Sequence, residues 1–498
     1  MVPADLLFPH DVVRDEQSKL LEKVENCVLY KKNLIAHAPT GLGKTAATVA
    51  PALSYALKNN KTVLFLTSRH TQHKIVIDTL REIREKFGTR FSVASIIGKK
   101  WMCLVPGTEA LYSSDFADYC KKAREERKCE FYVNARKNQG AFTVKATAVL
   151  ERLKELPPMT TEQVIKEGSL ETMCPYELSL GLAKSARVII ADYYYLFHPD
   201  IGDNFLQRSG KEIKDFIVIV DEAHNLPYRL KDLASEHLSG PTLRRAIREA
   251  KKTGNEKIIS KLVEIQDILN RLTERFSPGE ERIVKKSDFE PSEYDDAIEE
   301  LEEAGTAIRE VQKQSYVGSV ATFMKSWLGK EEGFARIISL KKGLKETYIQ
   351  LSYRCLDPSV VCKDTINSTH STILMSGTLQ PTSMYKEMLG IENCEESSYK
   401  DPFPKTNRLN LVFPKTTTAY KARTENQYTD IANTLAEMIK LVPGNSAVFF
   451  PSYFIKEKVE YLLQQKVHRT IISEVSEISK QEKQDMLDRF KTYKETGA

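Results

Sequence analysis

Residues 38–45 read Ala-Pro-Thr-Gly-Leu-Gly-Lys-Thr, a pattern whose residue types can hold the phosphates of a nucleotide. Gly41 and Gly43 allow backbone N–H groups to approach phosphate oxygens closely. Lys44 can reach the β- and γ-phosphates, and the Thr45 hydroxyl can ligate Mg²⁺. The loop residues that we predict to contact a nucleotide are Thr40, Gly41, Leu42, Gly43, Lys44 and Thr45.

The residues on either side of this loop strengthen the prediction. Ala38 stands where the plain GxxxxGK[ST] motif has its first glycine, so a flexible turn is the alternative interpretation. Residues 33–35 predict a strand before the loop, and residues 46–50 predict a helix after it. The N-terminus of a helix favours an anion, which makes phosphate binding the better interpretation.

An acidic pair, Asp221-Glu222, follows an unbroken apolar run at residues 216–220. Such a run predicts a strand buried on both faces, as in parallel sheets. A carboxylate at the end of that strand lies where open α/β sheets bind ligands. Asp221 would hold Mg²⁺, mainly through water, and Glu222 would orient or deprotonate the attacking water. A solvated turn is the alternative for the pair alone. Together with the loop at 38–45, the pair predicts an ATPase-type core.

Bulk properties narrow the class of protein. The 498-residue chain has room for two to four domains, and its formal charge of +5 neither demands nor excludes nucleic acid. No apolar run approaches the roughly 18 residues of a membrane span, and the N-terminus does not resemble a signal peptide. We therefore expect a cytoplasmic protein without disulfides. High Lys and Glu content would also suit a thermophile, and we expect a prokaryotic, archaeal source.

Further apolar runs indicate the architecture. Residues 63–66, 188–190 and 373–375 predict buried strands, and helical stretches alternate with them, so we expect a doubly wound parallel sheet. Two segments interrupt the alternation. Residues 100–180 hold four cysteines, and residues 228–345 are highly charged and predicted to be helical.

Within the second interruption, apolar residues recur at heptad-like spacing between 258 and 272 and between 301 and 311, which predicts a helical bundle or an antiparallel pair. After residue 385 a second α/β section is expected. Its strand candidates are residues 409–413 and 447–450, and a predicted helix ends near Val442-Pro443-Gly444.

The four cysteines of the first interruption are Cys103, Cys120, Cys129 and Cys174. No CxxC pair occurs among them, so an ordinary zinc ribbon or knuckle is disfavoured. Four thiolates in one insertion could ligate a 4Fe–4S cluster, but spacing alone leaves buried or incidental thiols as the favoured alternative. The other four cysteines of the chain are interpreted as core or incidental residues.

At this point the chain resembles the XPD helicases, iron–sulfur members of helicase superfamily 2 that also include the DinG-like enzymes. The matching segments, in family order, are Phe8-Pro9 with Arg14 and Gln17, residues 38–45, Leu66-Thr67-Ser68-Arg69-His70-Thr71-Gln72, Gly98-Lys99-Lys100-Trp101-Met102-Cys103, Cys174-Pro175-Tyr176, Ala191-Asp192-Tyr193 with Tyr195-Leu196-Phe197, Asp221-Glu222-Ala223-His224, Ser376-Gly377-Thr378-Leu379, and Pro443-Gly444-Asn445 with Val448-Phe449-Phe450-Pro451-Ser452-Tyr453.

The resemblance implies a fold class and a division into domains. The fold is α/β, a RecA-like parallel-sheet motor domain with an Fe–S insertion and a helical arch insertion, plus a partial second RecA-like domain. The expected domains are motor domain 1 (1–99, 181–227 and 346–384), the 4Fe–4S domain (100–180), the arch (228–345) and a partial motor domain 2 (385–498).

The resemblance also implies an activity and its cofactors. These are ATP-driven 5′-to-3′ translocation on single-stranded DNA, opening of forked duplex DNA, and a role in DNA repair, with ATP, Mg²⁺ and a 4Fe–4S cluster held by the four cysteines. Arg14 and Gln17 would lie on the adenine side of the nucleotide. We expect a monomer, and the resemblance does not identify which repair proteins would bind it.

Several residues are predicted to follow the DNA strand, because single-strand tracks combine cations with aromatic faces. They are Arg69, Lys99, Lys100 and Tyr193. For the tyrosines at 193–195 a role in the core is as good an interpretation as a role on DNA. The segment Ser376-Gly377-Thr378 would couple hydrolysis to movement.

The chain departs from the family in one large respect. No Gln-x-x-Gly-Arg-x-x-Arg segment, which would supply arginine fingers, occurs in the sequence. An arginine finger contributes roughly 10³–10⁵ in rate, so we expect either a fragment of a longer helicase or a module that binds ATP and single-stranded DNA without efficient unwinding. An RNA-directed DEAH-box enzyme is a third, disfavoured possibility. His37, where many relatives carry an acidic residue, is a smaller departure.

Overall fold

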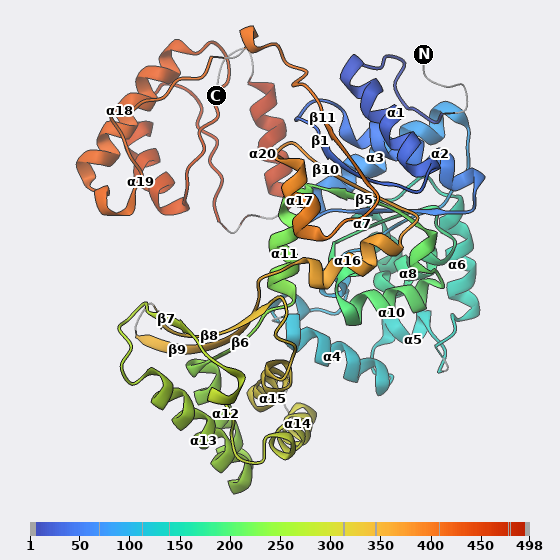
Figure 1. Cartoon of the computed structure of the whole chain (residues 1–498). Coiled ribbons are helices and arrows are strands. Elements are labelled where there is room, and N and C mark those ends of the chain that lie inside the picture. The colour runs from blue at the N-terminus through green and yellow to red at the C-terminus, as the bar shows by residue number, and fades with distance from the viewer. Residues whose placement is uncertain are drawn as a thin grey trace. The chain divides into compact units, whose positions relative to one another are not determined.

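The computed structural model describes residues 6–68, 70–111, 113–138, 140–311, 314–343, 346–407, 409–476, 478 and 480–493 (Figure 1). The chain divides into two compact units, Met1–Phe403 and Pro404–Ala498, and each is described by itself. No helix among the described residues is long and apolar enough to cross a membrane.

A seven-stranded sheet forms the centre of the first unit, and every neighbouring pair of its strands is parallel. The strand order is β11-β1-β10-β5-β2-β4-β3. The predicted doubly wound α/β sheet is therefore confirmed. The strands are β1 (Asn33–His37), β2 (Thr62–Leu66), β3 (Val93–Ser95), β4 (Val188–Ala191), β5 (Phe216–Asp221), β10 (Ser371–Ser376) and β11 (Cys394–Ser398).

Helices cover both faces of this sheet, which explains why its central strands are apolar without alternation (Figure 1). In β2, Val63 and Phe65 join the core on one face, whereas Leu64 and Leu66 join the core on the other. The first face is packed by α1 (Asp15–Leu29), α2 (Lys44–Lys58) and α3 (His70–Phe87). The second is packed by α8 (Pro175–Ser185), α9 (Tyr194–Phe197), α10 (Pro199–Ser209), α11 (Leu226–Leu233), α16 (Ser359–Ser368) and α17 (Thr382–Leu389).

The cysteine-containing insertion is helical throughout its regular part. Its apolar residues Ala146, Val149, Leu150, Leu153 and Val164 belong to the same core as α8, so the insertion is packed onto the sheet's second face. Its elements are the 3₁₀ helices η1 (Lys99–Met102) and η2 (Thr108–Ala110), and the helices α4 (Ser113–Glu125), α5 (Glu130–Ala135), α6 (Val144–Glu155) and α7 (Thr161–Leu170).

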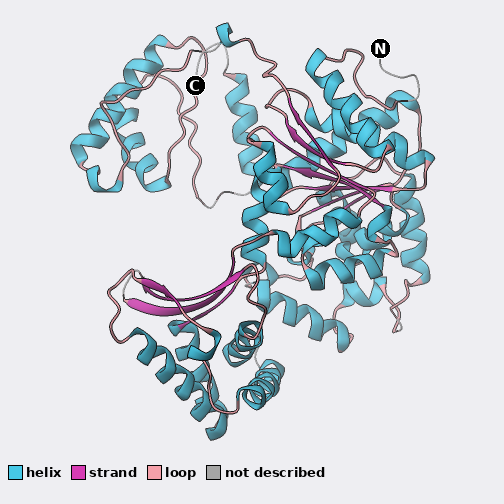
Figure 2. Cartoon of the chain, in the orientation of Figure 1, coloured by secondary structure: helices cyan, strands magenta, loops and turns pink. Residues whose placement is uncertain are grey.

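The second insertion contains a sheet that the sequence analysis did not predict. Four antiparallel strands in the order β6-β9-β8-β7 form it, separate from the main sheet (Figure 2). They are β6 (Glu236–Ser239), β7 (Glu281–Ile283), β8 (Phe334–Lys342) and β9 (Thr347–Cys355). The heptad-like segments form helices, as predicted. The helices are α12 (Gly240–Thr253), α13 (Glu256–Thr273), α14 (Tyr294–Val311) and α15 (Tyr316–Trp327), and they share one core with the sheet.

The first sheet extends further along the chain than the sequence predicted. β11, which lies beyond residue 385, pairs in parallel with β1 from Asn33↔Cys394 to His37↔Ser398. The segment that the sequence assigned to the second α/β section therefore supplies the edge strand of the first sheet, and the first unit continues to Phe403.

The described part of the second unit contains three α-helices, α18 (Glu425–Leu441), α19 (Tyr453–Gln464) and α20 (Lys480–Thr492). The predicted strands at 409–413 and 447–450 are wrong, because both segments lack regular structure. Val412 and Phe449 are 90% and 92% exposed. A strand needs a hydrogen-bonded neighbour, and no described residue of this unit supplies one. The predicted helix near 429–441 is present as α18.

Candidate active site

The segments singled out in the sequence follow neighbouring strands at one edge of the main sheet. β1 ends at His37 before the phosphate-binding loop, β10 at Ser376, β5 at Asp221 and β2 at Leu66. These strands are consecutive in the sheet, with His37 paired to Ser376 and Met375 to Asp221. Because the strands are parallel, their carboxyl ends all meet at the edge where open α/β sheets bind ligands.

The loop at 38–45 has the backbone that a phosphate site requires. Gly41 and Gly43 adopt φ values of 86° and 85°, a region that side chains other than glycine rarely occupy. The Arg14 guanidinium donates a hydrogen bond to the Gly41 carbonyl, and the Gln17 amide donates to the Gly43 carbonyl over 3.3 Å. Leu42 is 1% exposed and belongs to the core on the sheet's first face. The two residues expected on the adenine side thus brace the loop.

Replacing Gly43 with alanine is expected to distort this loop. A Cβ built there would lie 2.2 Å from the Gln17 amide nitrogen, and the positive φ would be strained as well. Nucleotide affinity measured by fluorescence titration should fall about tenfold or more, while the thermal unfolding temperature should fall only about as much as in Gly88→Ala, because both substitutions strain a positive φ. Gly88→Ala is the matched control, since Gly88 also has positive φ but no atom within 4 Å of the built Cβ. An unchanged affinity would contradict the proposed role of the loop.

A cavity of about 670 Å³ opens beside the loop. This volume suits a small-molecule or cofactor site. The residues that line it are His10, Val12, Arg14, Gln17, Gly41, Gly43, Lys44, Thr45, Gln72, Ile75, Val76, Asp221 and Glu222. The structure therefore gathers around one cavity the loop lysine, both acidic residues and both residues expected near adenine.

The two carboxyl groups that line this cavity favour the binding of a cation. Asp221 is 7% exposed, and burial together with the charge of Glu222 raises the pKa of Asp221 to about 6. The positive charge of Lys44 acts in the opposite direction. A divalent cation would favour the ionised carboxylate, and the hydroxyl of Thr45 lines the same cavity. The structure therefore places two residues with oxygen donors, Thr45 and Asp221, at one cavity.

The Glu222 carboxylate is held by side chains from two other segments and by one from its own. Gln72 donates from its amide over 3.4 Å, Ser376 donates its hydroxyl over 3.3 Å, and Nδ1 of His224 lies 3.3 Å away. Glu222 itself adopts φ 50°, a left-handed conformation that is uncommon for a non-glycine residue. A strained backbone with a fully engaged carboxylate is typical of a residue whose position matters for function.

Ser376 connects this carboxylate to its own segment and to the phosphate loop. The hydroxyl of Ser376 lies 2.6 Å from Nδ1 of His224 and accepts a hydrogen bond from the Thr378 backbone over 3.2 Å. A Cβ built on Gly377 would lie 3.5 Å from the Thr40 hydroxyl. A movement of residues 376–378 would therefore be felt at both the acidic residue and the loop.

The sequence analysis quoted Gln72 and His224 within motifs but gave neither a role. The structure places both against Glu222, and the Thr67 hydroxyl in turn donates to the Gln72 side-chain oxygen. Gln72 lies just after the carboxyl end of β2, so its position at the ligand edge of the sheet is the signal that could have identified it.

The residues predicted to follow DNA do not form one group in the structure. Tyr193 is 2% exposed and donates its hydroxyl to the Asp221 and Glu222 carbonyls, which is at odds with base stacking and favours the alternative role in the core. Lys99 lies 4.8 Å from the centre of the Tyr176 ring, and burial lowers its pKa. Lys100 donates to the Leu111 carbonyl and lies over Trp101. Arg69 is outside the described residues.

The four cysteines of the insertion line one small cavity, which we call the cysteine cradle. Cys103 follows η1, Cys120 lies on α4, and Cys129 and Cys174 are the N-cap residues of α5 and α8. The apolar side chains Leu104, Val105, Phe116 and Phe131 share its wall with the cations Lys99 and Arg124. All eight cysteines of the chain are free thiols.

The cradle supplies features that suit cysteine thiolates. Burial raises the pKa of Cys129, and it raises the pKa of Cys174 to about 12. The cations Lys99 and Arg124 line the same cavity. Nearby cations can offset the negative charge of the thiolates that hold an iron–sulfur cluster.

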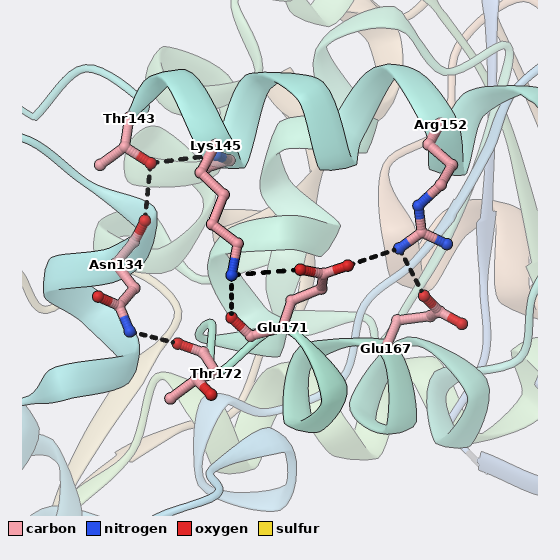
Figure 3. Close-up of polar contacts among 8 residues, drawn as sticks. Asn134, Thr143, Lys145, Arg152, Glu167, Glu171 and Thr172 are labelled. Carbon is pink, nitrogen blue, oxygen red and sulfur yellow. Dashed lines mark hydrogen bonds and ion pairs between the residues drawn. The ribbon is translucent and has the colours of Figure 1, made fainter.

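Backbone contacts fix the two halves of the cradle that carry Cys129 and Cys174. The Cys174 N–H donates to the Phe131 carbonyl over 2.9 Å. The Asn134 amide donates to the Thr172 carbonyl over 2.9 Å, and the Thr143 hydroxyl donates to the Asn134 carbonyl over 2.7 Å (Figure 3). The loop before Cys174 is thereby tied to α5.

Ion pairs between α6 and α7 support the same loop (Figure 3). Arg152 contacts Glu167 at 2.9 Å and Glu171 at 3.1 Å, and Lys145 contacts the carboxylate and the carbonyl of Glu171. Because Glu171 precedes the loop to Cys174, these contacts hold the start of that loop without any cofactor.

Among the described residues, no group of three or more His, Cys, Asp or Glu side chains converges in the way that one metal ion requires. A 4Fe–4S cluster makes a different demand, because each of its four cysteines binds a separate iron and the sulfurs stand further apart. The donor set, the shared cavity and the two cations fit such a cluster.

The sheet, the phosphate loop and the acidic turn define a nucleotide-binding motor of the helicase class. The DEAD_2 family model matches residues 65–243, and the DEAD/DEAH box helicase model matches residues 16–110. The chain is 26% identical over 458 residues to the "ATP-dependent DNA helicase XPD" of Sulfolobus acidocaldarius, covering 90% of this chain and 74% of that protein.

A second relative is the "General transcription and DNA repair factor IIH helicase subunit XPD/RAD3" of Saccharomyces cerevisiae, 22% identical over 560 residues, which cover 92% of this chain and 70% of the relative. Among solved structures, "XPD_Helicase" gives a TM-score of 0.59 at 22% identity, covering 96% of this chain and 79% of that one. Xpd4 of S. tokodaii gives 0.54 at 17% identity with the same coverage. In sequence and in fold, this chain is similar to the XPD helicases.

Proposed function

We propose that the protein is an ATP-dependent DNA helicase that moves 5′ to 3′ along single-stranded DNA, opens forked duplexes and serves DNA repair. The nucleotide would lie in the cavity beside the loop at 38–45, with Lys44 on its β- and γ-phosphates. Thr45 and Asp221 would hold Mg²⁺, which neutralises charge on the phosphates when bound. Glu222 would accept the proton of the attacking water or orient that water.

The observation that carries this proposal is the convergence on Glu222. Gln72, which follows β2, and Ser376, which ends β10, meet at its carboxylate, and the Ser376 carbonyl accepts a hydrogen bond from Ala38 of the phosphate loop over 2.9 Å. A hydrolytic base contacted by two separate segments responds to any movement of those segments. This arrangement supports coupling between hydrolysis and a moving strand, as a motor requires.

DNA-stimulated ATP turnover of the purified chain tests the proposal. We expect single-stranded DNA to raise kcat well above the rate without nucleic acid, and RNA of the same sequence to raise it less. Forked substrates with a single 5′ or 3′ tail then test the direction, and only the 5′-tailed fork should open. Absence of stimulation by DNA, or stronger stimulation by RNA, would contradict the assignment.

We further propose that the cysteine cradle holds a 4Fe–4S cluster. Cys103, Cys120, Cys129 and Cys174 would each bind one iron, and Lys99 and Arg124 would offset the negative charge of the thiolates. The cavity that all four cysteines share with these two cations supports this assignment.

Replacing Cys174 with serine is expected to remove the cluster. Anaerobically purified wild-type protein should be brown and hold about four irons per chain, and the variant should be nearly colourless with much less iron. Cys362→Ser is the matched control, because Cys362 is fully buried but lies outside the cradle. A colourless, iron-free wild-type preparation would refute the cluster and leave the ATPase proposal standing.

A further inference from the structure

Tyr193 has a set of contacts that neither the phosphate site nor the cysteine cradle explains. It follows β4 and caps the short helix α9. Its side chain is 2% exposed, and its hydroxyl donates to the backbone carbonyls of Asp221 and Glu222, the latter over 3.2 Å. One buried donor thus serves the backbone of both acidic residues.

These carbonyls belong to the one strained turn of the candidate active site. Glu222 adopts φ 50° and ψ 41°, and a non-glycine residue keeps such a conformation only where its surroundings hold it. The Asn225 N–H also donates to the Glu222 carbonyl over 3.0 Å. Tyr193 is the side chain that adds hydrogen bonds to both peptide units and so opposes rotation of the turn.

Tyr193 reaches the turn from outside the nucleotide cavity. Asp221 and Glu222 line that cavity, whereas Tyr193 does not. The phenol of Tyr193 therefore binds the backbone of the turn from outside the cavity. The hydroxyl therefore ties the carboxyl ends of β4 and β5 together.

The protonation state of Tyr193 suits this role. Burial raises the pKa of the phenol far above its usual range, and the nearby charges of Asp221, Asp192 and Glu222 act in the same direction. The group is therefore a neutral donor at neutral pH.

We propose that Tyr193 is a positioning residue for ATP hydrolysis and acts by holding the Asp221–Glu222 turn in its left-handed conformation. This inference rests on the proposed ATPase function of the same site. It replaces the alternative in which the ring stacks on a DNA base, and it differs from a purely structural role because its effect falls on the chemical step.

Tyr193→Phe is the test, since it removes the hydroxyl and keeps the ring. We expect kcat for ATP to fall roughly 10- to 100-fold, because a misplacement of about 1 Å at a reacting group can cost about 10²-fold. The KM for ATP and the affinity for a non-hydrolysable analogue should stay within about twofold of wild type, because the phosphate loop is untouched. The loss should be equal with and without single-stranded DNA, and half-maximal stimulation should occur at the same DNA concentration.

Tyr353→Phe is the matched control. Tyr353 is 6% exposed and donates its hydroxyl to the Lys330 carbonyl over 2.6 Å, but it lies on β9, in the second sheet. It should lower the unfolding temperature about as much as Tyr193→Phe and leave kcat unchanged. A Tyr193→Phe enzyme with wild-type kcat would overturn the inference, and so would a loss confined to DNA-stimulated turnover.

The outcomes separate this inference from the function on which it rests. If wild-type protein hydrolyses ATP and Lys44→Ala does not, the proposed function stands, and Tyr193→Phe alone then decides the inference. If wild-type turnover is absent or equals that of Lys44→Ala, the proposed function fails and the inference fails with it.

Discussion

Replacing Glu222 with glutamine is expected to abolish most ATP turnover while ATP still binds. The substitution keeps the size of the side chain but removes the group that can accept a proton. General-base catalysis contributes about 10²–10⁴ in rate, so kcat should fall by about that factor. The affinity for ATP should remain close to wild type, because Lys44 and the loop N–H groups are unchanged. Steady-state turnover and equilibrium titration with a fluorescent analogue measure the two effects separately.

Asp215→Asn is the matched control for this experiment. Asp215 lies just before β5, at the opposite end of the strand that carries Asp221, and it pairs with Lys61 at 3.4 Å. Neutralising it removes one carboxylate from the same strand but none from the site, so kcat should stay unchanged. If Glu222→Gln kept wild-type kcat, Glu222 would not be the base, and the network around its carboxylate would have another purpose.

The main sheet could be predicted because its strands are buried on both faces. β5 contains five consecutive apolar residues before Asp221, and an unbroken run of that length indicates a strand with no solvent-facing side. The positive φ values of the phosphate loop could be predicted equally well, because they fall on the glycines Gly41 and Gly43. These features are encoded locally, within a few residues of the chain.

The second sheet could not be predicted in this way. β7 is exposed along its whole length, and β8 and β9 are buried only in part, so their residues show neither a continuous apolar run nor a clean alternation. Their pairing joins residues that are close in the fold but distant in the chain, such as Leu238 and Leu351. For the apolar runs at 409–413 and 447–450 the error was the opposite one, since strands were predicted where none formed. An apolar run forms a strand only beside a hydrogen-bonded neighbouring strand.

Local sequence patterns also could not predict the contacts that organise the active site. Gln72 and Ser376 are separated from Glu222 by 150 and 154 residues, and Tyr193 by 29. The order of strands in the sheet brings them together, and that order is set by the whole fold. Tyr193 illustrates the difficulty, because an aromatic residue in a helicase motif suggested a DNA contact until its burial was known.

Replacing Lys44 with alanine is expected to remove both tight ATP binding and turnover. Lys44 is the first residue of α2, and its ammonium makes no hydrogen bond or ion pair with any residue that the structure describes. It is a residue of the phosphate loop, and it lines the same cavity as Asp221 and Glu222. Its charge would be used on the β- and γ-phosphates, where negative charge develops as the bond to the γ-phosphate breaks. Removing one such donor typically costs about 10²–10³ in kcat, and the affinity for ATP should fall as well.

Lys58→Ala is the control that keeps the same helix, because Lys58 is the last residue of α2 and lies at its opposite end. It should leave kcat and ATP affinity unchanged. The contrast with Glu222→Gln is informative, since that variant should bind ATP normally and Lys44→Ala should not. A Lys44→Ala protein with wild-type affinity and turnover would show that the loop at 38–45 does not hold the phosphates. The nucleotide site would then have to be sought away from this edge of the sheet, even though four adjacent strands direct their functional residues there.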